Sequence, residues 1–193
     1  MSGNGAIHAK AAAVPTLIHT QVRIPSGHVE IAPEEHKALT IDDTPEVFRE
    51  AADPSSFNPN PIDMAYHICE VLRSQCKLHR SHEHLFLLLY FDRVIEKLTA
   101  GSTLRGALLP LPKARFSMAG DAQSAVTADF AFWTGRRFVT VFIRESQFDQ
   151  DSSEERLLKM WGIDVHRLMA DQIETRGLST EAGAKLLEVL WLL

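Results

Sequence analysis

The sequence predicts a single α/β domain in which helices flank a mixed sheet. Two long segments near the middle of the chain carry apolar residues at helical spacing. The C-terminal half alternates short apolar strands with helical segments, which is typical of α/β folds. Apolar residues make up 45% of the 193 residues and charged residues 23%, so the chain can bury one sizeable core.

The first 62 residues are expected to form an N-terminal arm. After a small, polar tail, an alternating pattern with the turn sequence PSG predicts a β-hairpin over residues 16–31. A short helix is expected at 45–52. The run DPSSFNPNP at 53–61 is rich in residues that end helices and strands. We therefore assign the main domain to residues 63–193.

The main domain is expected to begin with two helices, over residues 62–79 and 81–98, because apolar residues recur there at intervals of three and four. A tight connection at Thr134-Gly135-Arg136 joins two apolar runs and predicts a hairpin. The remaining elements are expected as strands at 107–111, 126–132, 138–144 and 163–168, helices at 152–161 and 180–193, and a helical turn at 171–176.

Composition also indicates where the protein works. No apolar run reaches the roughly 18 residues that a membrane-spanning helix needs. The first residues make a poor secretory signal. The two cysteines, Cys69 and Cys76, do not make a disulfide framework. We therefore expect a soluble, cytoplasmic protein that does not associate with membranes.

Charge is unevenly distributed along the chain. The net charge is −5, but residues 63–120 carry +3 while the segments on either side carry −4 each. Independent DNA-binding domains are usually basic overall, because phosphate neutralisation supplies much of their affinity. We therefore expect any nucleic-acid binding to use the basic residues of segment 63–120, the basic middle. The alternative interpretation is that these residues form a solvated helix face. The candidate contact residues are Arg73, Lys77, Arg80 and Arg93.

Two stretches of the C-terminal half resemble a known superfamily. VTADFAFWTGRRFVTVFI (126–143) looks like an acidic residue followed by a strand hairpin, and EERLLKMWGIDVHRLMADQIE (154–174) looks like the helix and strand that come next. Together they resemble the restriction-endonuclease-like, PD-(D/E)XK superfamily, and in particular small domains of the very-short-patch-repair endonuclease type. The V-x-R strand of those domains matches Val165 and Arg167, after Gly162.

The resemblance implies a metal site that this chain has largely lost. In active members, an acid and a second carboxylate on the next strand hold Mg²⁺, which activates water for attack on phosphate. Asp129 matches the first acid. The position of the second carboxylate is occupied here by Phe142, and the position two residues later is occupied by Arg144. Phenylalanine cannot bind a metal, and arginine keeps its proton at any working pH, so it cannot act as a general base.

Two interpretations of Asp129 remain open. It is an acid in an otherwise apolar strand, which is costly unless the carboxylate is paired or binds metal. In the first interpretation it forms an ion pair with Arg144 across the hairpin, and no cofactor is bound. In the second, Glu83 or Glu145 supplies the missing carboxylate and a Mg²⁺ site survives.

The expected function is that of a catalytically degenerate nuclease-fold subunit, which handles nucleic acid or assembles with a partner. The alternatives are an active Mg²⁺-dependent nuclease and a module that binds only protein. The apolar C-terminal segment, with Leu186, Leu187, Leu190 and Trp191, either docks on its own domain or anchors a partner protein or a second copy.

Overall fold

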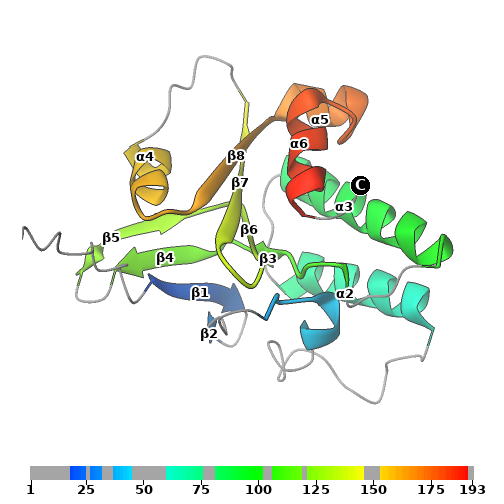
Figure 1. Ribbon diagram of the computed structural model, residues 1–193, viewed down its shortest axis with the longest axis horizontal. Helices are drawn as coiled ribbons and strands as arrows, with labels where there is room; N and C mark the ends of the chain where they lie inside the picture. The colour runs from blue at the N-terminus through cyan, green and yellow to red at the C-terminus, as the bar shows by residue number, and fades with distance from the viewer. Residues whose placement is uncertain are drawn as a thin grey trace, which may run out of the picture.

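The computed structural model describes residues 18–24, 27–31, 37–44, 60–75, 81–101, 106–118, 121–145 and 153–190. Within these ranges the strands form two four-stranded sheets, and helices flank the sheet that holds the C-terminal strands (Figure 1). The expected α/β class, with a mixed sheet between helices, is therefore confirmed. Among the described residues, no helix has both the length and the apolar character needed to cross a membrane.

The central sheet has the strand order β3-β6-β7-β8. Its first three strands are antiparallel, and β8 runs parallel to β7, with Phe142 opposite Arg167. A parallel neighbour requires a crossover connection, and α4 is the helix of that connection. Both β6 and β7 are buried, except at Arg144, because helices cover both faces. The bounds are β3 Leu111–Pro112, β6 Phe130–Trp133, β7 Phe138–Arg144, β8 Asp164–Met169 and α4 Ser153–Met160.

The helices lie on both sides of β7 and β8. Figure 1 shows α4 on one side and α3, α5 and α6 on the other. Aromatic stacking joins α3 to β6, since the ring of Phe86 lies 4.7 Å from that of Phe130 and Tyr90 lies 5.2 Å from Phe132. On its other side α3 packs against α2. The bounds are α2 Pro61–Gln75, α3 Ser81–Thr99, α5 Ala170–Arg176 and α6 Glu181–Val189.

The second sheet is antiparallel, with the order β2-β1-β4-β5. The N-terminal hairpin expected from the sequence is confirmed as β1 and β2, and β1 also pairs with β4 of the main domain. Ile41, in the short 3₁₀ helix η1, is fully buried in the core. Much of the expected arm is thus hydrogen-bonded to or packed on the rest. The bounds are β1 Ile18–Ile24, β2 Gly27–Ile31, β4 Arg115–Met118, β5 Asp121–Thr127 and η1 Ile41–Asp43.

Both strands of one long hairpin cross from one sheet to the other at the same place. The chain leaves β3 for β4 at Lys113-Ala114, and it leaves β5 for β6 at Ala128-Asp129. Two backbone hydrogen bonds of 2.9 Å join the crossing points, from Lys113 N–H to the Asp129 carbonyl and from Ala128 N–H to the Ala114 carbonyl. Lys113 has φ +52°, a left-handed conformation that is costly for a residue with a Cβ. The bend brings Lys113 opposite Asp129.

Two sequence-based strand predictions are wrong in detail. The strand expected over 126–132 is two strands in different sheets, and Asp129 lies between them because its carbonyl and carboxylate bond to Lys113 and Ile143. The strand expected over 107–111 is reduced to Leu111, while Leu108 forms a single bridge with Thr40. The helix expected at 45–52 lies outside the described residues.

The C-terminal helix docks on its own domain. Leu186 and Leu190 are fully buried and Leu187 is 3% exposed, so these three leucines belong to the core. Thr180 caps the helix by accepting a hydrogen bond from the Gly183 N–H over 3.1 Å. The leucines expected as a partner anchor are thus occupied within the chain. Trp191 lies outside the described residues.

Candidate functional site

An ammonium group lies between two carboxylates at the bend of the long hairpin. Lys113 Nζ is 3.0 Å from Asp129 Oδ1 and also contacts Glu83 Oε1. Glu83 is fully buried and Asp129 is 7% exposed, while the Lys113 side chain is 26% exposed. Buried carboxylates need a cation or hydrogen-bond donors to offset their lost hydration. We call Glu83, Lys113 and Asp129 the lysine–carboxylate cluster.

Four parts of the fold position this cluster. Glu83 lies in the first turn of α3, where a negative charge is favoured by the helix dipole. Lys113 and Asp129 come from the two crossing points of the long hairpin. The second carboxylate oxygen of Asp129 accepts a hydrogen bond of 2.8 Å from the Ile143 N–H in β7. Both oxygens of Asp129 are therefore engaged by groups of the chain.

The residues at this point do not fit a Mg²⁺ ion. Two carboxylates do converge, but the Lys113 ammonium holds the position that they share. Phe142, which stands where the resemblance expects the second carboxylate, offers no oxygen. Mg²⁺ requires near-octahedral oxygen ligands. Throughout the part of the chain that the structure describes, no group of three or more His, Cys, Asp or Glu side chains could hold a metal ion.

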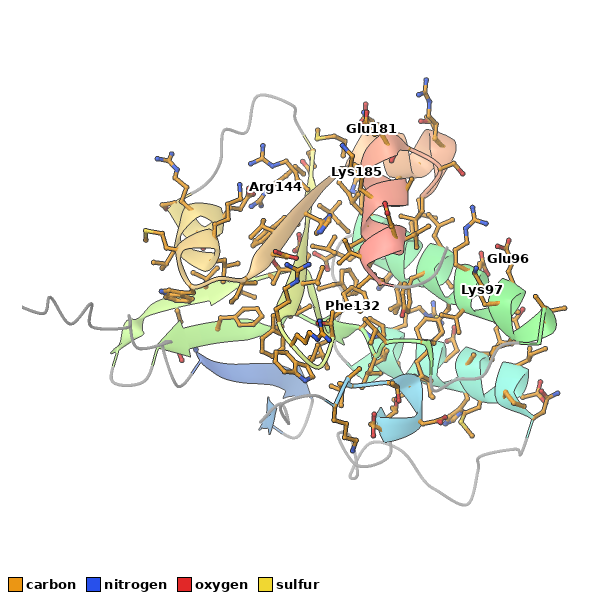
Figure 2. The ribbon with its side chains drawn as sticks, in the orientation of Figure 1. Glu96, Lys97, Phe132, Arg144, Glu181 and Lys185 are labelled. Atoms are coloured by element: carbon orange, nitrogen blue, oxygen red, sulfur yellow. The ribbon has the colours of Figure 1, made fainter. Side chains whose placement is uncertain are left out.

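A second charged cluster lies on the α4 side of the central sheet. Glu155, in α4, is only 1% exposed at its side chain, and two arginines bind it. Arg144 from β7 lies 2.7 Å from Glu155 Oε1, and Arg167 from β8 lies 2.6 Å from Oε2. Figure 2 shows Arg144 reaching from β7 toward α4. The guanidinium of Arg144 also lies over the Phe142 ring, 4.7 Å from its centroid.

This arginine–glutamate cluster (Arg144, Glu155 and Arg167) carries one net positive charge. Its arginine side chains are partly exposed, at 19% and 28%. Its geometry also shows that the expected ion pair between Asp129 and Arg144 is wrong. Asp129 pairs with Lys113, and Arg144 pairs with Glu155. The reason is the bend, which turns Asp129 away from the strand face that Arg144 shares with Phe142.

The other candidate residues do not join these clusters. Glu145 is exposed just past β7, so of the three candidate carboxylates only Glu83 and Asp129 meet. Arg73 pairs with Glu70 and Arg93 with Glu96 on their own helices, which reduces the positive charge of the basic middle. Lys77 and Arg80 lie outside the described residues.

Sequence reasoning missed Lys113 and Glu155 as site residues. Lys113 is the first charged residue in the otherwise apolar run ALLPLPKARF. A cation isolated in an apolar run indicates that a buried anionic partner lies nearby. Glu155 is three residues before the buried Leu158, on the same face of α4. That spacing predicts a buried acid, which in turn requires a cation.

No protein-family model, curated protein or solved structure matches the chain. Two features of the molecule bear on its function. One is the lysine in the position shared by two carboxylates, and the other is the pair of partly exposed arginines on the α4 side of the sheet.

Proposed function

We propose that the chain is a catalytically degenerate nuclease-like domain that contributes to nucleic-acid handling together with a partner. The order of elements supports this proposal. A helix, a strand hairpin, a second helix and a returning parallel strand are the arrangement expected from the restriction-endonuclease-like resemblance. Here they are α3, β6 with β7, α4 and β8.

The observation that carries the proposal is the position of Lys113 Nζ. It contacts both Glu83 and Asp129, two of the three acids that are candidates for Mg²⁺ ligands. One positive charge in that position offsets part of the carboxylate charge without any metal. An ammonium group cannot activate water as a metal does. Lys113 therefore keeps the acids of a nuclease-like fold in place while removing their catalytic use.

The arginine–glutamate cluster supports a role with nucleic acid. Guanidinium groups recognise phosphate through paired N–H donors. Arg144 and Arg167 are anchored on Glu155, so little side-chain entropy is lost when they meet a further anion. The net charge of −5 works against long-range attraction of nucleic acid. We therefore expect a partner protein or a second copy of the chain to supply much of the affinity.

The catalytic half of the proposal is tested with purified full-length chain on single- and double-stranded DNA and RNA. We expect no cleavage that depends on Mg²⁺ or Mn²⁺. Asp129→Asn is the informative variant, and Glu145→Gln is its control because Glu145 is exposed. The other candidate is an active nuclease, which the convergence of Glu83 and Asp129 favours. Metal-dependent cleavage that Asp129→Asn abolishes and Glu145→Gln preserves would establish that candidate instead.

The nucleic-acid half is tested by fluorescence anisotropy of labelled duplexes across a salt series. A phosphate-contacting arginine contributes about one unit to the slope of log affinity against log salt concentration. We expect Arg167→Gln to lower that slope by about one, because it removes one phosphate contact. The variant should keep the fold, because Arg144 still neutralises Glu155. Arg73→Gln, which breaks an exposed intrahelical pair, should leave the slope unchanged. Equal slopes for wild type and Arg167→Gln, or no binding at low salt, would favour a protein-interaction module.

A further inference from the structure

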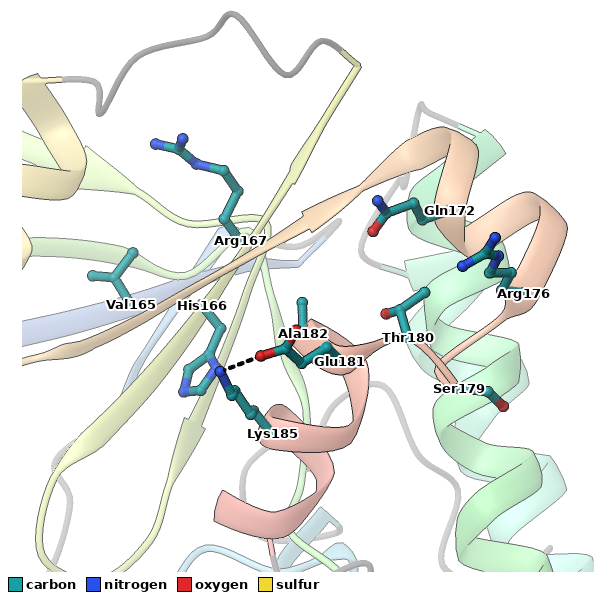
Figure 3. A pocket seen from close by; sticks show the side chains of 10 residues that line it. All are labelled: Val165, His166, Arg167, Gln172, Arg176, Ser179, Thr180, Glu181, Ala182 and Lys185. Carbon is teal, nitrogen blue, oxygen red and sulfur yellow. Dashed lines mark hydrogen bonds and ion pairs between the residues drawn. The ribbon is translucent and has the colours of Figure 1, made fainter.

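A pocket lies at the edge of the central sheet, between β8 and the two C-terminal helices. Its volume is about 560 Å³. The strand contributes Val165, His166 and Arg167, and the rest comes from α5, α6 and the turn that joins them. Figure 3 shows His166 pointing toward α6, while Arg167 projects from the opposite side of the strand. No member of the lysine–carboxylate cluster lines this pocket.

One uncompensated positive charge lines the pocket. Arg176 and Lys185 are cationic, and Glu181 is the one acid among the described lining residues. The Arg167 guanidinium lies on the other side of β8, where it binds Glu155. Lys185 and Glu181 pair with each other over 2.7 Å and largely cancel. Arg176 makes no ion pair within the described ranges, so its guanidinium charge is uncompensated. Burial lowers the pKa of His166, which makes it a neutral hydrogen-bonding group at pH 7.

Neutral donors lie beside these charges. The pocket is lined by Gln172, Ser179 and Thr180, and Figure 3 shows the Thr180 hydroxyl pointing toward β8. Thr180 Oγ1 accepts a hydrogen bond from the Gly183 N–H, which leaves its own hydroxyl proton able to donate. The first N–H groups of α6 have no partner inside the helix. A guanidinium, a hydroxyl and helix N–H groups at one pocket are the donors that recognise phosphate oxygens.

Close packing keeps the pocket walls together. A Cβ on Gly183 would lie 2.5 Å from the Leu178 carbonyl oxygen, so only glycine lets α6 approach the preceding turn this closely. Leu178 and Leu186 are buried in the hydrophobic core. The α6 wall therefore holds a fixed position beside the Ser179-Thr180 turn, and binding need not first order these groups.

We propose that this pocket binds a small phosphomonoester, with the phosphate at Arg176 and Thr180 and an organic body along β8. The volume argues for the organic body, since it falls within the roughly 300–1,000 Å³ of small-molecule sites. Ala182 and the face of the His166 ring line the space for that body. The inference does not depend on the proposed nuclease-like role, because the two sites share only Arg167 at their border.

Isothermal titration calorimetry of the full chain tests the proposal with four probes. These are adenosine 5′-monophosphate, ribose 5-phosphate, inorganic phosphate and adenosine. We expect the two organic phosphates to bind, inorganic phosphate to bind about tenfold more weakly, and adenosine not to bind. Tighter binding of ribose 5-phosphate would indicate a sugar as the organic body, and tighter binding of adenosine 5′-monophosphate would indicate a nucleoside. Equal affinity of inorganic and organic phosphates, or no binding of either, overturns the proposal.

Charge variants locate the site. Arg176→Gln should weaken binding of the tighter organic phosphate by about tenfold. Glu181→Gln should strengthen binding several-fold, because it removes the one acid among the described lining residues and releases Lys185. Both residues are exposed, so the fold should tolerate either change. Arg73→Gln on α2 is the matched control, since it removes a cation from an exposed ion pair elsewhere. Unchanged affinity in both pocket variants places any binding elsewhere and overturns the assignment.

Discussion

Lys113 and Asp129 are joined twice. The backbone N–H of Lys113 donates to the Asp129 carbonyl over 2.9 Å, and the Lys113 ammonium lies 3.0 Å from the Asp129 carboxylate. The first bond fixes the point where the long hairpin passes between the two sheets. The second places a positive charge at that point, within reach of the buried Glu83 as well. The bend of the hairpin and the charge balance of the candidate site therefore depend on the same residue.

Replacing Lys113 with methionine should destabilise the fold. The change keeps most of the side-chain volume and the left-handed backbone but removes the cation from two buried carboxylates. Removing one partner of a buried ion pair costs roughly 3–5 kcal/mol, and the partial exposure of Lys113 puts the expected loss near the lower end. The free energy of unfolding, from urea denaturation followed by circular dichroism, measures this loss.

A double variant separates charge from packing in that experiment. Adding Glu83→Gln to Lys113→Met removes one of the two carboxylates that faced the ammonium, so it should restore part of the lost stability. In the wild-type background, Glu83→Gln alone should be destabilising, because it weakens the same cluster. If the two changes add independently, Lys113 acts through its packing and the ionic account of the cluster is incorrect.

Substitutions of the three residues of the arginine–glutamate cluster should reduce the stability of the fold by unequal amounts. Glu155→Gln leaves two arginines without their carboxylate, whereas Arg144→Gln or Arg167→Gln leaves Glu155 with one guanidinium. We expect Glu155→Gln to cost about 2–3 kcal/mol and each single arginine variant about 1 kcal/mol, since both arginines are partly exposed. Urea denaturation measures all three. A loss in Arg144→Gln as large as that in Glu155→Gln would show that Arg167 does not compensate.

Local patterns predicted most of the elements of this fold. The helical spacing before and after Ser81 gave α2 and α3, and Gly162, with φ +76°, ends the turn after α4 as expected. The hairpin at Thr134-Gly135-Arg136 also formed. These features depend on residues close together in the sequence, which is why their periodicity and turn residues were sufficient.

The candidate site was less predictable, because it depends on contacts between distant segments. The apolar strand predicts that Asp129 needs a partner, but the match to the superfamily's metal motif points to Arg144, 15 positions later. The bend at Lys113 brings in a lysine from the preceding strand instead, 16 positions away. Glu83 comes from a helix 30 positions before that lysine. No periodic pattern encodes where a hairpin crosses between sheets, so the partner of a buried charge was not fixed by local sequence.

The buried thiol of Cys69 gives a prediction for alkaline pH. Burial, with the nearby Glu70 carboxylate, raises the pKa of Cys69 from 9.0 to about 12. The unfolded chain releases this proton near pH 9, whereas the folded chain holds it until about pH 12. The folded state then binds more protons, so stability is fully present below pH 9 and falls as pH rises toward 12, by at most about 1.4 kcal/mol per pH unit for one group. Burial also raises the pKa of Tyr90, which adds to the slope of the unfolding free energy against pH.

Urea denaturation between pH 9 and 12 tests this prediction. The slope of the unfolding free energy against pH should be shallower for Cys69→Ala than for wild type, but not zero. Identical slopes would mean that Cys69 does not titrate differently in the two states.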